Sequence, residues 1–192
     1  MAFLLLTCLG ALGLAACGQS TSSTAKASAG ACTQASGISQ TANTPSYKMV
    51  LDIGPREAMY TPAQAKAQHP THGEVMLRGQ MTDMGKTGSM GAMGNMGNMG
   101  ASASARHLEV HICDRSTGQV AANLQPAITL VDNSAANMTD HLPTAVMQGV
   151  ISPHADVHYG NNVTMPPSRR FTVMVTVGDQ HATFHVKTPS AS

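Results

Sequence analysis

Charged residues are scarce in this chain: 11 Lys and Arg and 10 Asp and Glu among 192 residues give a formal net charge of +1. The sequence has no basic patch or stripe of the kind that binds nucleic acid, so we expect no nucleic-acid surface. It also lacks a Ser-His-Asp sequence context, a phosphate-binding glycine loop and a catalytic-cysteine setting, and we expect no enzyme activity. After the N-terminal segment, no apolar stretch is long enough to cross a membrane.

The N-terminal segment is almost wholly apolar as far as Cys17. It is too short for a lasting transmembrane helix, but it suits the hydrophobic region of a secretory signal. The motif Leu14-Ala15-Ala16-Cys17 resembles the lipobox of bacterial lipoproteins, although no Lys or Arg precedes the apolar run. The resemblance implies a signal peptide over residues 1–16, a lipid on Cys17, and anchoring to a bacterial membrane in the periplasm or at the cell surface. A plain membrane anchor or a buried helix is the weaker alternative.

The remaining chain divides by composition. Residues 17–45 are mostly Ser, Thr, Ala, Gly and Gln, which predicts a disordered tether. Residues 46–188 contain short apolar or alternating segments between turn signals, which predict an all-β domain: an antiparallel, immunoglobulin-like sandwich of about seven strands. A short helix is expected over 61–70, where Pro62 suits the first turn. The expected strands are 47–53, 74–79, 106–113, 127–132, 145–147, 171–177 and 182–187.

A glycine-rich segment over residues 80–105 interrupts this domain. Glycine opposes both helix and strand, so the segment predicts a long flexible insertion that cannot bury its side chains. It carries six closely spaced methionines: Met81, Met84, Met90, Met93, Met96 and Met99. Thioethers are soft ligands that suit Cu(I), so metal capture is the favoured interpretation. A linker in which methionine has no role and a sacrificial shield against oxidation are the alternatives.

His107, Glu109 and His111 alternate with apolar residues and should therefore share one face of a strand. Successive members lie ~6.5–7 Å apart, so the three alone cannot surround an ion. Two of them, joined by donors from a neighbouring segment, can close a site, and imidazole suits Cu, Zn, Fe and Ni. A solvated polar strand face is the alternative.

A second stretch, from Met147 to His158, adds a thioether, a carboxylate and two imidazoles, His154 and His158. The order of a His-x-Glu strand, a Met, His158-Tyr-Gly-Asn-Asn-Val and a further strand resembles the periplasmic ferrous-iron transport accessory proteins. The resemblance covers about the C-terminal half of the chain. It implies an immunoglobulin-like fold, copper binding, dimers, and a role in iron uptake beside a membrane permease.

Carried over residue by residue, the resemblance implies four metal ligands: His107, Glu109, Met147 and His158. His154 lies nearer to the family's usual distance from the methionine than His158 does. The family's last histidine has no clear counterpart, although His181 or His185 are candidates. The methionine run is not part of the family pattern.

Two cysteines, Cys32 and Cys113, lie outside the expected signal and lipidation site. An exported protein can oxidise such a pair to a disulfide, but two unrelated thiols are an equal expectation because Cys32 falls in the predicted tether. Cys113 as a metal ligand is a weaker third interpretation.

These patterns together predict a lipid-anchored, extracytoplasmic metal-binding protein that captures or handles copper, with iron as the alternative metal. A membrane metal permease is the candidate partner, and a homodimer is the candidate assembly. The first alternative is an immunoglobulin-like surface module that binds no metal. The second is a copper-dependent oxidase or dismutase.

Overall fold

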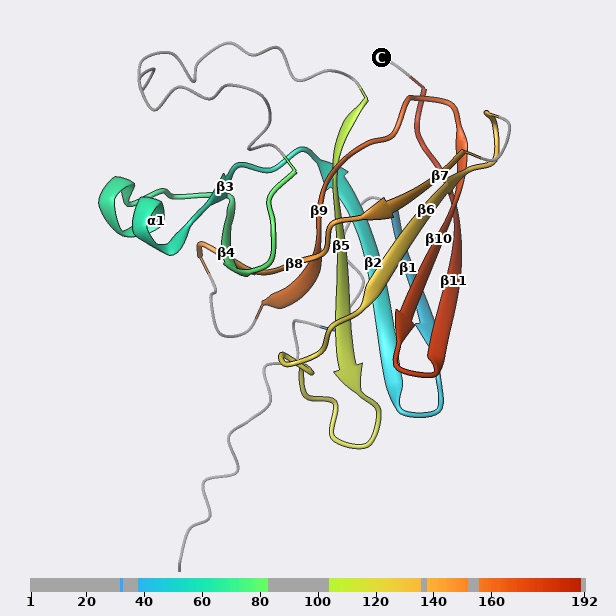
Figure 1. Ribbon diagram of the computed structural model, residues 1–192, viewed down its shortest axis with the longest axis horizontal. Coiled ribbons are helices and arrows are strands. Elements are labelled where there is room, and N and C mark those ends of the chain that lie inside the picture. The colour runs from blue at the N-terminus through green and yellow to red at the C-terminus, as the bar shows by residue number, and fades with distance from the viewer. Residues whose placement is uncertain (1–31, 33–37, 83–103, 136–137, 152–155, 191–192) are drawn as a thin grey trace, which may run out of the picture.

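The computed structural model describes residue 32 and residues 38–82, 104–135, 138–151 and 156–190. Within these ranges the chain is an all-β sandwich of a seven-stranded and a four-stranded sheet, with one short helix (Figure 1). The expected fold class is therefore confirmed.

The larger sheet has the strand order β1-β2-β5-β9-β8-β4-β3. Its strands are β1 (Ile38–Asn43), β2 (Tyr47–Pro55), β3 (Met59–Tyr60), β4 (Glu74–Arg78), β5 (Ala105–Asp114), β8 (Ala145–Gly149) and β9 (Val157–Thr164). The smaller sheet has the order β11-β10-β6-β7. Its strands are β6 (Ala127–Asp132), β7 (Met138–Leu142), β10 (Arg170–Val177) and β11 (Gln180–Lys187). Named neighbours are antiparallel, except that β3 and β4 run parallel.

All seven expected strands are present, as β2, β4, β5, β6, β8, β10 and β11. The expected helix is α1 (Pro62–Gln68), which begins with a capping box between Thr61 and Gln64. Four further strands, β1, β3, β7 and β9, were not expected. Strand β1 lies inside the predicted tether and pairs with β2, so the folded domain starts before the expected boundary at residue 46.

The core lies between the two sheets and is filled by alternating side chains of each strand. On β10, Phe171, Val173 and Val175 are buried, and polar or less buried residues separate them. Strand β5 differs because it is buried on both faces. Its apolar members point into the core, while His107 and His111 are buried on the opposite face of the sheet. That outer face therefore holds a polar cluster removed from water.

Close packing between β5 and β9 requires glycine at position 160. A Cβ at Gly160 would come within 1.9 Å of the carbonyl oxygen of Leu108. We expect Gly160→Ala to lower the free energy of unfolding by at least ~2 kcal/mol, because the strands would have to separate. Gly54→Ala is the matched control, since a Cβ there meets nothing within 4 Å. Urea unfolding in the presence of EDTA measures both, and equal stabilities would contradict the prediction.

A disulfide joins Cys32 to Cys113, near the end of β5, across a Cα–Cα distance of 6.3 Å. The expected alternatives were a disulfide, two unrelated thiols and Cys113 as a metal ligand. The structure contains the disulfide. The bond ties Cys32 to the larger sheet. It also removes Cys113 as a thiolate ligand, because both sulfur atoms are consumed in the bond.

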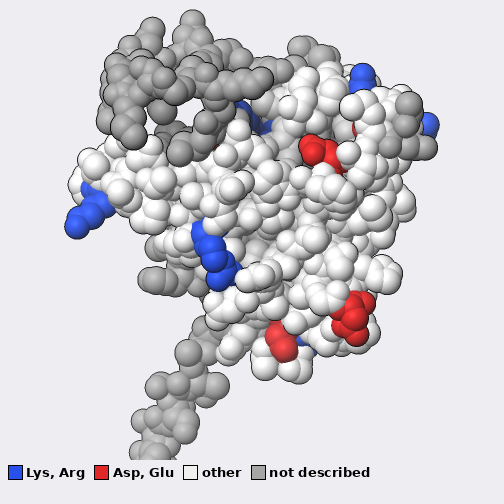
Figure 2. Space-filling model, viewed as in Figure 1, with Lys and Arg blue, Asp and Glu red and all other residues white. Residues whose placement is uncertain are grey.

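The surface carries few charges, as the composition requires. On the face seen in Figure 2, isolated Lys, Arg, Asp and Glu side chains lie among uncharged ones. Among the residues that the structure describes, no helix has the length and apolar character of a membrane span.

Candidate metal centre

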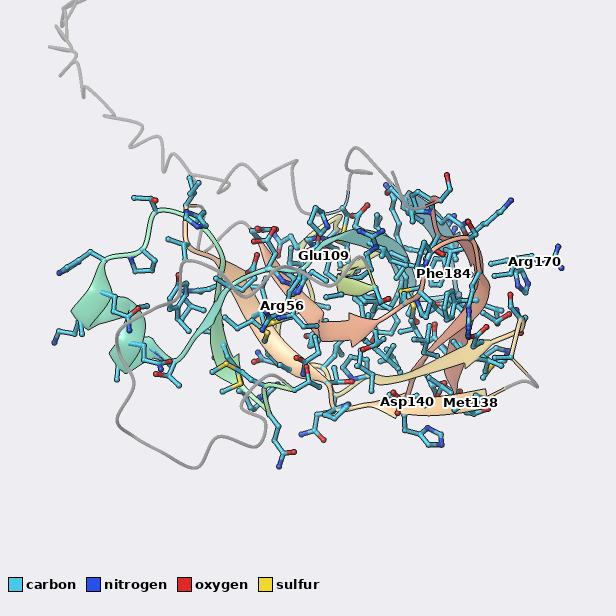
Figure 3. The ribbon with its side chains drawn as sticks, turned by 90° about the horizontal axis from the view of Figure 1, so that it is seen from above. Arg56, Glu109, Met138, Asp140, Arg170 and Phe184 are labelled. Carbon is cyan, nitrogen blue, oxygen red and sulfur yellow. A yellow bond between two sulfur atoms is a disulfide. The ribbon has the colours of Figure 1, made fainter. Side chains whose placement is uncertain are left out.

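Donor side chains from three strands of the larger sheet converge on its outer face: Glu74 of β4, His107 and Glu109 of β5, and His158 of β9. Each offers one ligand atom, and these atoms all lie within 4.8 Å of one another. The Nε2 atom of His158 is 3.4 Å from Oε2 of Glu74 and 3.5 Å from Oε2 of Glu109. Two donors bound to a tetrahedral ion at ~2.1 Å are ~3.4 Å apart, so these spacings fit one shared cation. Figure 3 shows Glu109 on the larger sheet, apart from Phe184 of the core.

The register between β5 and β9 brings three of the four donors together. Glu109 lies opposite Gly160, and His107 lies opposite Asn162. His158 precedes Gly160 by two residues, so its side chain points to the same face as that of Glu109. Because Gly160 has no side chain, nothing separates the Glu109 carboxylate from the His158 ring at this position in the sheet.

The next two strands, β8 and β4, extend the cluster. Met147 of β8 lies directly opposite His158 and is fully buried. Opposed residues in such a pair have Cβ atoms about 4.5–5.5 Å apart, which places the thioether side chain beside the imidazole. On β4, Met76 lies opposite Met147, and Glu74 lies opposite Gly149. Met147, an expected ligand, is therefore a neighbour of the four converging donors.

Hydrogen bonds fix which nitrogen each histidine presents. Nδ1 of His158 donates to the carbonyl oxygen of Asp156 at 3.0 Å. Nδ1 of His107 lies 3.1 Å from Oδ1 of Asn162. The Asn162 amide is oriented by Glu57, whose backbone carbonyl accepts from Nδ2 and whose N–H donates to Oδ1. Both histidines therefore carry their proton on Nδ1 and leave the Nε2 lone pair for a ligand bond.

Three donor atoms of the cluster are buried and have no hydrogen-bond partner among the described residues: Nε2 of His107, Nε2 of His158 and Oε2 of Glu74. A buried polar atom left unsatisfied costs about 1–3 kcal/mol. One cation bound at this position would satisfy all three atoms. The residues present therefore fit a metal ion.

Burial raises the pKa of Glu74 from 4.5 to about 8, and repulsion from Glu109, Asp156 and Glu57 contributes in the same direction. Without a cation, Glu74 is therefore mostly protonated at neutral pH. A bound metal supplies the missing positive charge, so binding should release the proton of Glu74.

Burial also lowers the pKa of His158 to about 4, so this histidine is neutral at pH 7 and can donate its lone pair. Burial alone would raise the pKa of Glu109, but its histidine neighbours lower it to about 2. Because His158 is neutral, the positive charge that holds Glu109 ionised comes chiefly from His111. The contact is an ion pair, since His111 Nε2 lies 3.8 Å from Glu109 Oε1, beyond hydrogen-bond length.

His111, an expected ligand, lies next to the four-donor cluster. Its ring centroid is 5.2 Å from that of His158. Burial lowers the pKa of His111, but contacts with Glu109, Asp156 and Asp52 outweigh burial and raise it. His111 is therefore a neighbour of the four converging donors and not one of them.

Of the other expected site residues, Met81, His181 and His185 lie in the described part of the chain, and Met81 is partly buried. His181 and His185 are exposed on β11 of the smaller sheet, so neither can supply the family's last histidine to this cluster. Seven expected residues fall outside the described part of the chain: Cys17, Met84, Met90, Met93, Met96, Met99 and His154.

Glu74 was not expected as a site residue. The sequence does hold a signal for it, because the carboxylate begins a short, otherwise apolar strand segment, Glu74-Val-Met-Leu. An acidic residue in such a position is rarely buried unless it is paired or binds a metal. Its partners could not be read from the sequence, since β4 and β5 are separated by two other strands in the sheet.

Asn162 positions His107 and is not one of the four converging donors. We expect Asn162→Ala to weaken metal binding by ~10–100-fold, because the His107 ring loses the acceptor that fixes its tautomer. Chelator competition measures the change. Asn162→Asp, which keeps an acceptor oxygen at this position, should recover part of the affinity. If both variants bind as tightly as the unaltered protein, Asn162 does not position the ligand.

No family model matches the chain. No curated protein matches it either. Among solved structures, it is similar to the crystal structure of a DUF4426 family protein from Pseudomonas aeruginosa, with 10% sequence identity and a TM-score of 0.44. The match covers 80% of this chain and 97% of that chain.

Proposed function

We propose that the protein binds a transition-metal cation, copper first, at the centre formed by Glu74, His107, Glu109 and His158. The observation that carries the proposal is the convergence of four donor atoms. Three of these atoms are buried and find no hydrogen-bond partner within the described part of the chain. Two of the donors are imidazole nitrogens whose tautomers are set for ligation. A purely structural polar cluster would leave these atoms unsatisfied.

Copper is favoured by the ligand types. Imidazole binds Cu, Zn, Fe and Ni, and carboxylates extend the range to harder ions. Met147 beside His158 adds a thioether, which suits Cu(I). A centre with imidazole, carboxylate and thioether donors can hold both Cu(II) and Cu(I). Ferrous iron is the alternative metal, because two imidazoles and two carboxylates also suit it.

The methionine run is proposed to collect Cu(I) and pass it to this centre. Both described ends of the run lie near the site. On one side, Thr82 Oγ1 donates to the backbone carbonyl of Asn162, the residue that orients His107. On the other side, β5 begins at Ala105, two residues before His107. Soft thioethers held beside the centre would raise the local concentration of copper.

The proposed cellular setting rests on the sequence motifs and on the resemblance to the periplasmic ferrous-iron transport accessory proteins. We propose an extracytoplasmic protein that is anchored through a lipid on Cys17. In this setting it would capture copper, or support iron uptake beside a membrane permease. An enzymatic role is not proposed, because no sequence feature selects a substrate.

Titration of the purified, untagged protein with Cu(II) and Cu(I) in competition with chelators tests the proposal. We expect a dissociation constant well below micromolar for at least one oxidation state. Binding no tighter than micromolar for either oxidation state, and for Fe(II), would end it.

The methionine run can be tested separately. Replacing its six methionines together with isoleucine should lower the number of Cu(I) ions bound per chain and leave Cu(II) affinity unchanged, because thioethers hold Cu(II) poorly. Isoleucine keeps the apolar volume and removes only the sulfur donor. An unchanged Cu(I) count would favour a linker without a metal role.

A further inference from the structure

We propose that this centre holds two cations, bridged by the carboxylate of Glu109. The inference rests on the proposed metal binding and extends it to a second ion. The first ion is bound by Glu74, His107, His158 and one oxygen of Glu109. The second is bound by the other oxygen of Glu109 together with Asp52 of β2 and His111 of β5.

The two oxygens of Glu109 face different partners. Oε2 lies 3.5 Å from Nε2 of His158, on the side of the first ion. Oε1 lies 3.8 Å from Nε2 of His111. A carboxylate with each oxygen directed at a different imidazole has the arrangement of a bridging ligand between two metal ions.

The second set of donors meets the same spacing criterion as the first. Ligand atoms of Asp52, Glu109 and His111 all lie within 4.8 Å of one another. Oδ2 of Asp52 is 4.0 Å from His111 Nε2. The register explains this closeness, because Asp52 and Glu109 are directly opposite each other on β2 and β5. Asp52 is buried, with 4% of its surface exposed.

A carboxylate lies beside the other nitrogen of the His111 ring. The His111 side chain is only 7% exposed, and its Nδ1 atom has no hydrogen-bond partner among the described residues. Oδ1 of Asp156 lies 3.8 Å from that nitrogen. A carboxylate on the far side of a ligating imidazole is the usual support for such a ligand. Closing this short gap would fix the proton on Nδ1 and direct Nε2 to the second ion.

Charge favours two ions over one. Four carboxylates surround three imidazoles here, from Asp52, Glu74, Glu109 and Asp156. One divalent cation and a protonated His111 balance three of these negative charges, whereas two divalent cations bound to neutral imidazoles balance all four. Because two of its three proposed protein ligands are carboxylates, the second position should favour a divalent ion such as Cu(II) over Cu(I).

The number of bound ions tests this inference. We expect native mass spectrometry of the whole chain to detect two Zn(II) ions held in this centre, since thioethers have little affinity for zinc. His111→Ala should lose one of them and keep the other. His181→Ala, which removes an exposed histidine of the other sheet, is the matched control and should lose none.

Electron paramagnetic resonance with Cu(II) distinguishes neighbouring ions from distant ones. Two Cu(II) ions joined by a carboxylate should give a spin-coupled signal with a half-field transition, and His111→Ala should return it to the signal of an isolated ion. If the unaltered protein holds one ion at this centre with no coupling, the bridge is wrong while the proposed metal binding stands. If no metal binds at all, both are wrong.

Discussion

Replacing His158 with alanine is expected to weaken copper binding by at least ~100-fold. This loss is at least as large as the ~10–100-fold loss that follows the removal of a residue supporting a metal ligand. His158 is fully buried and is the residue that lies between the two glutamates, within 3.5 Å of both. Without the imidazole of His158, no nitrogen donor lies between the carboxylates of Glu74 and Glu109. Competition against a chelator of known affinity measures the loss.

Two controls separate ligation from folding. His181→Ala removes an exposed histidine from β11 and should leave copper affinity unchanged. Circular dichroism and urea unfolding in EDTA should show that the His158→Ala chain keeps the sandwich. A folded His158→Ala protein that binds copper as tightly as the unaltered chain would remove this histidine from the site.

Glu74→Gln is expected to stabilise the metal-free protein at alkaline pH. The pKa of Glu74 is about 8 in the folded state and 4.5 in its ordinary range, so the folded chain holds a proton that the unfolded chain releases. This contribution is present in full below about pH 4.5 and is lost as the pH rises through 8. We therefore expect the variant to be more stable by ~2–4 kcal/mol near pH 8.5 and to lose this advantage toward pH 5.

The same substitution should weaken copper binding, because a carboxylate ligand becomes a neutral amide. It should also reduce the number of protons released on binding near pH 7. Urea unfolding in EDTA at several pH values measures stability, and calorimetry in two buffers measures the protons. Asp140→Asn, at an exposed position on β7, is the control for removing a carboxylate. A pH-independent difference between Glu74→Gln and the unaltered chain would show that Glu74 is ionised in the fold.

The fold class could be predicted because the strongest strands alternate in the sequence. Residues Phe171 to Val177 carry apolar side chains at every second position, and Gly178 follows as the turn. Strand β9 was missed because Gly160 and its two following asparagines are poor strand formers. The strand tolerates them because Gly160 allows close packing on β5, and because Asn161 and Asn162 make side-chain hydrogen bonds.

Three of the four donors of the candidate site could be predicted, because they lie in local motifs. The His107-x-Glu109 stripe carries two of them, and the His158-Tyr-Gly stretch carries the third. Glu74 could not be placed with them, since its distance from His158 depends on the order of strands in the sheet. Nor could the sequence show that His111 lies outside the four-donor cluster. The alternation of residues tells which face of the strand a side chain is on, but it does not tell which residues of other strands lie beside it.

The central claim is that a metal ion binds between β4, β5 and β9 on the outer face of the larger sheet. A crystal of the copper-loaded protein, measured on both sides of the copper absorption edge, tests it most directly. We predict an anomalous peak within bonding distance of Nε2 of both His107 and His158. Copper located only at surface histidines, with these two nitrogens unliganded, would contradict the claim.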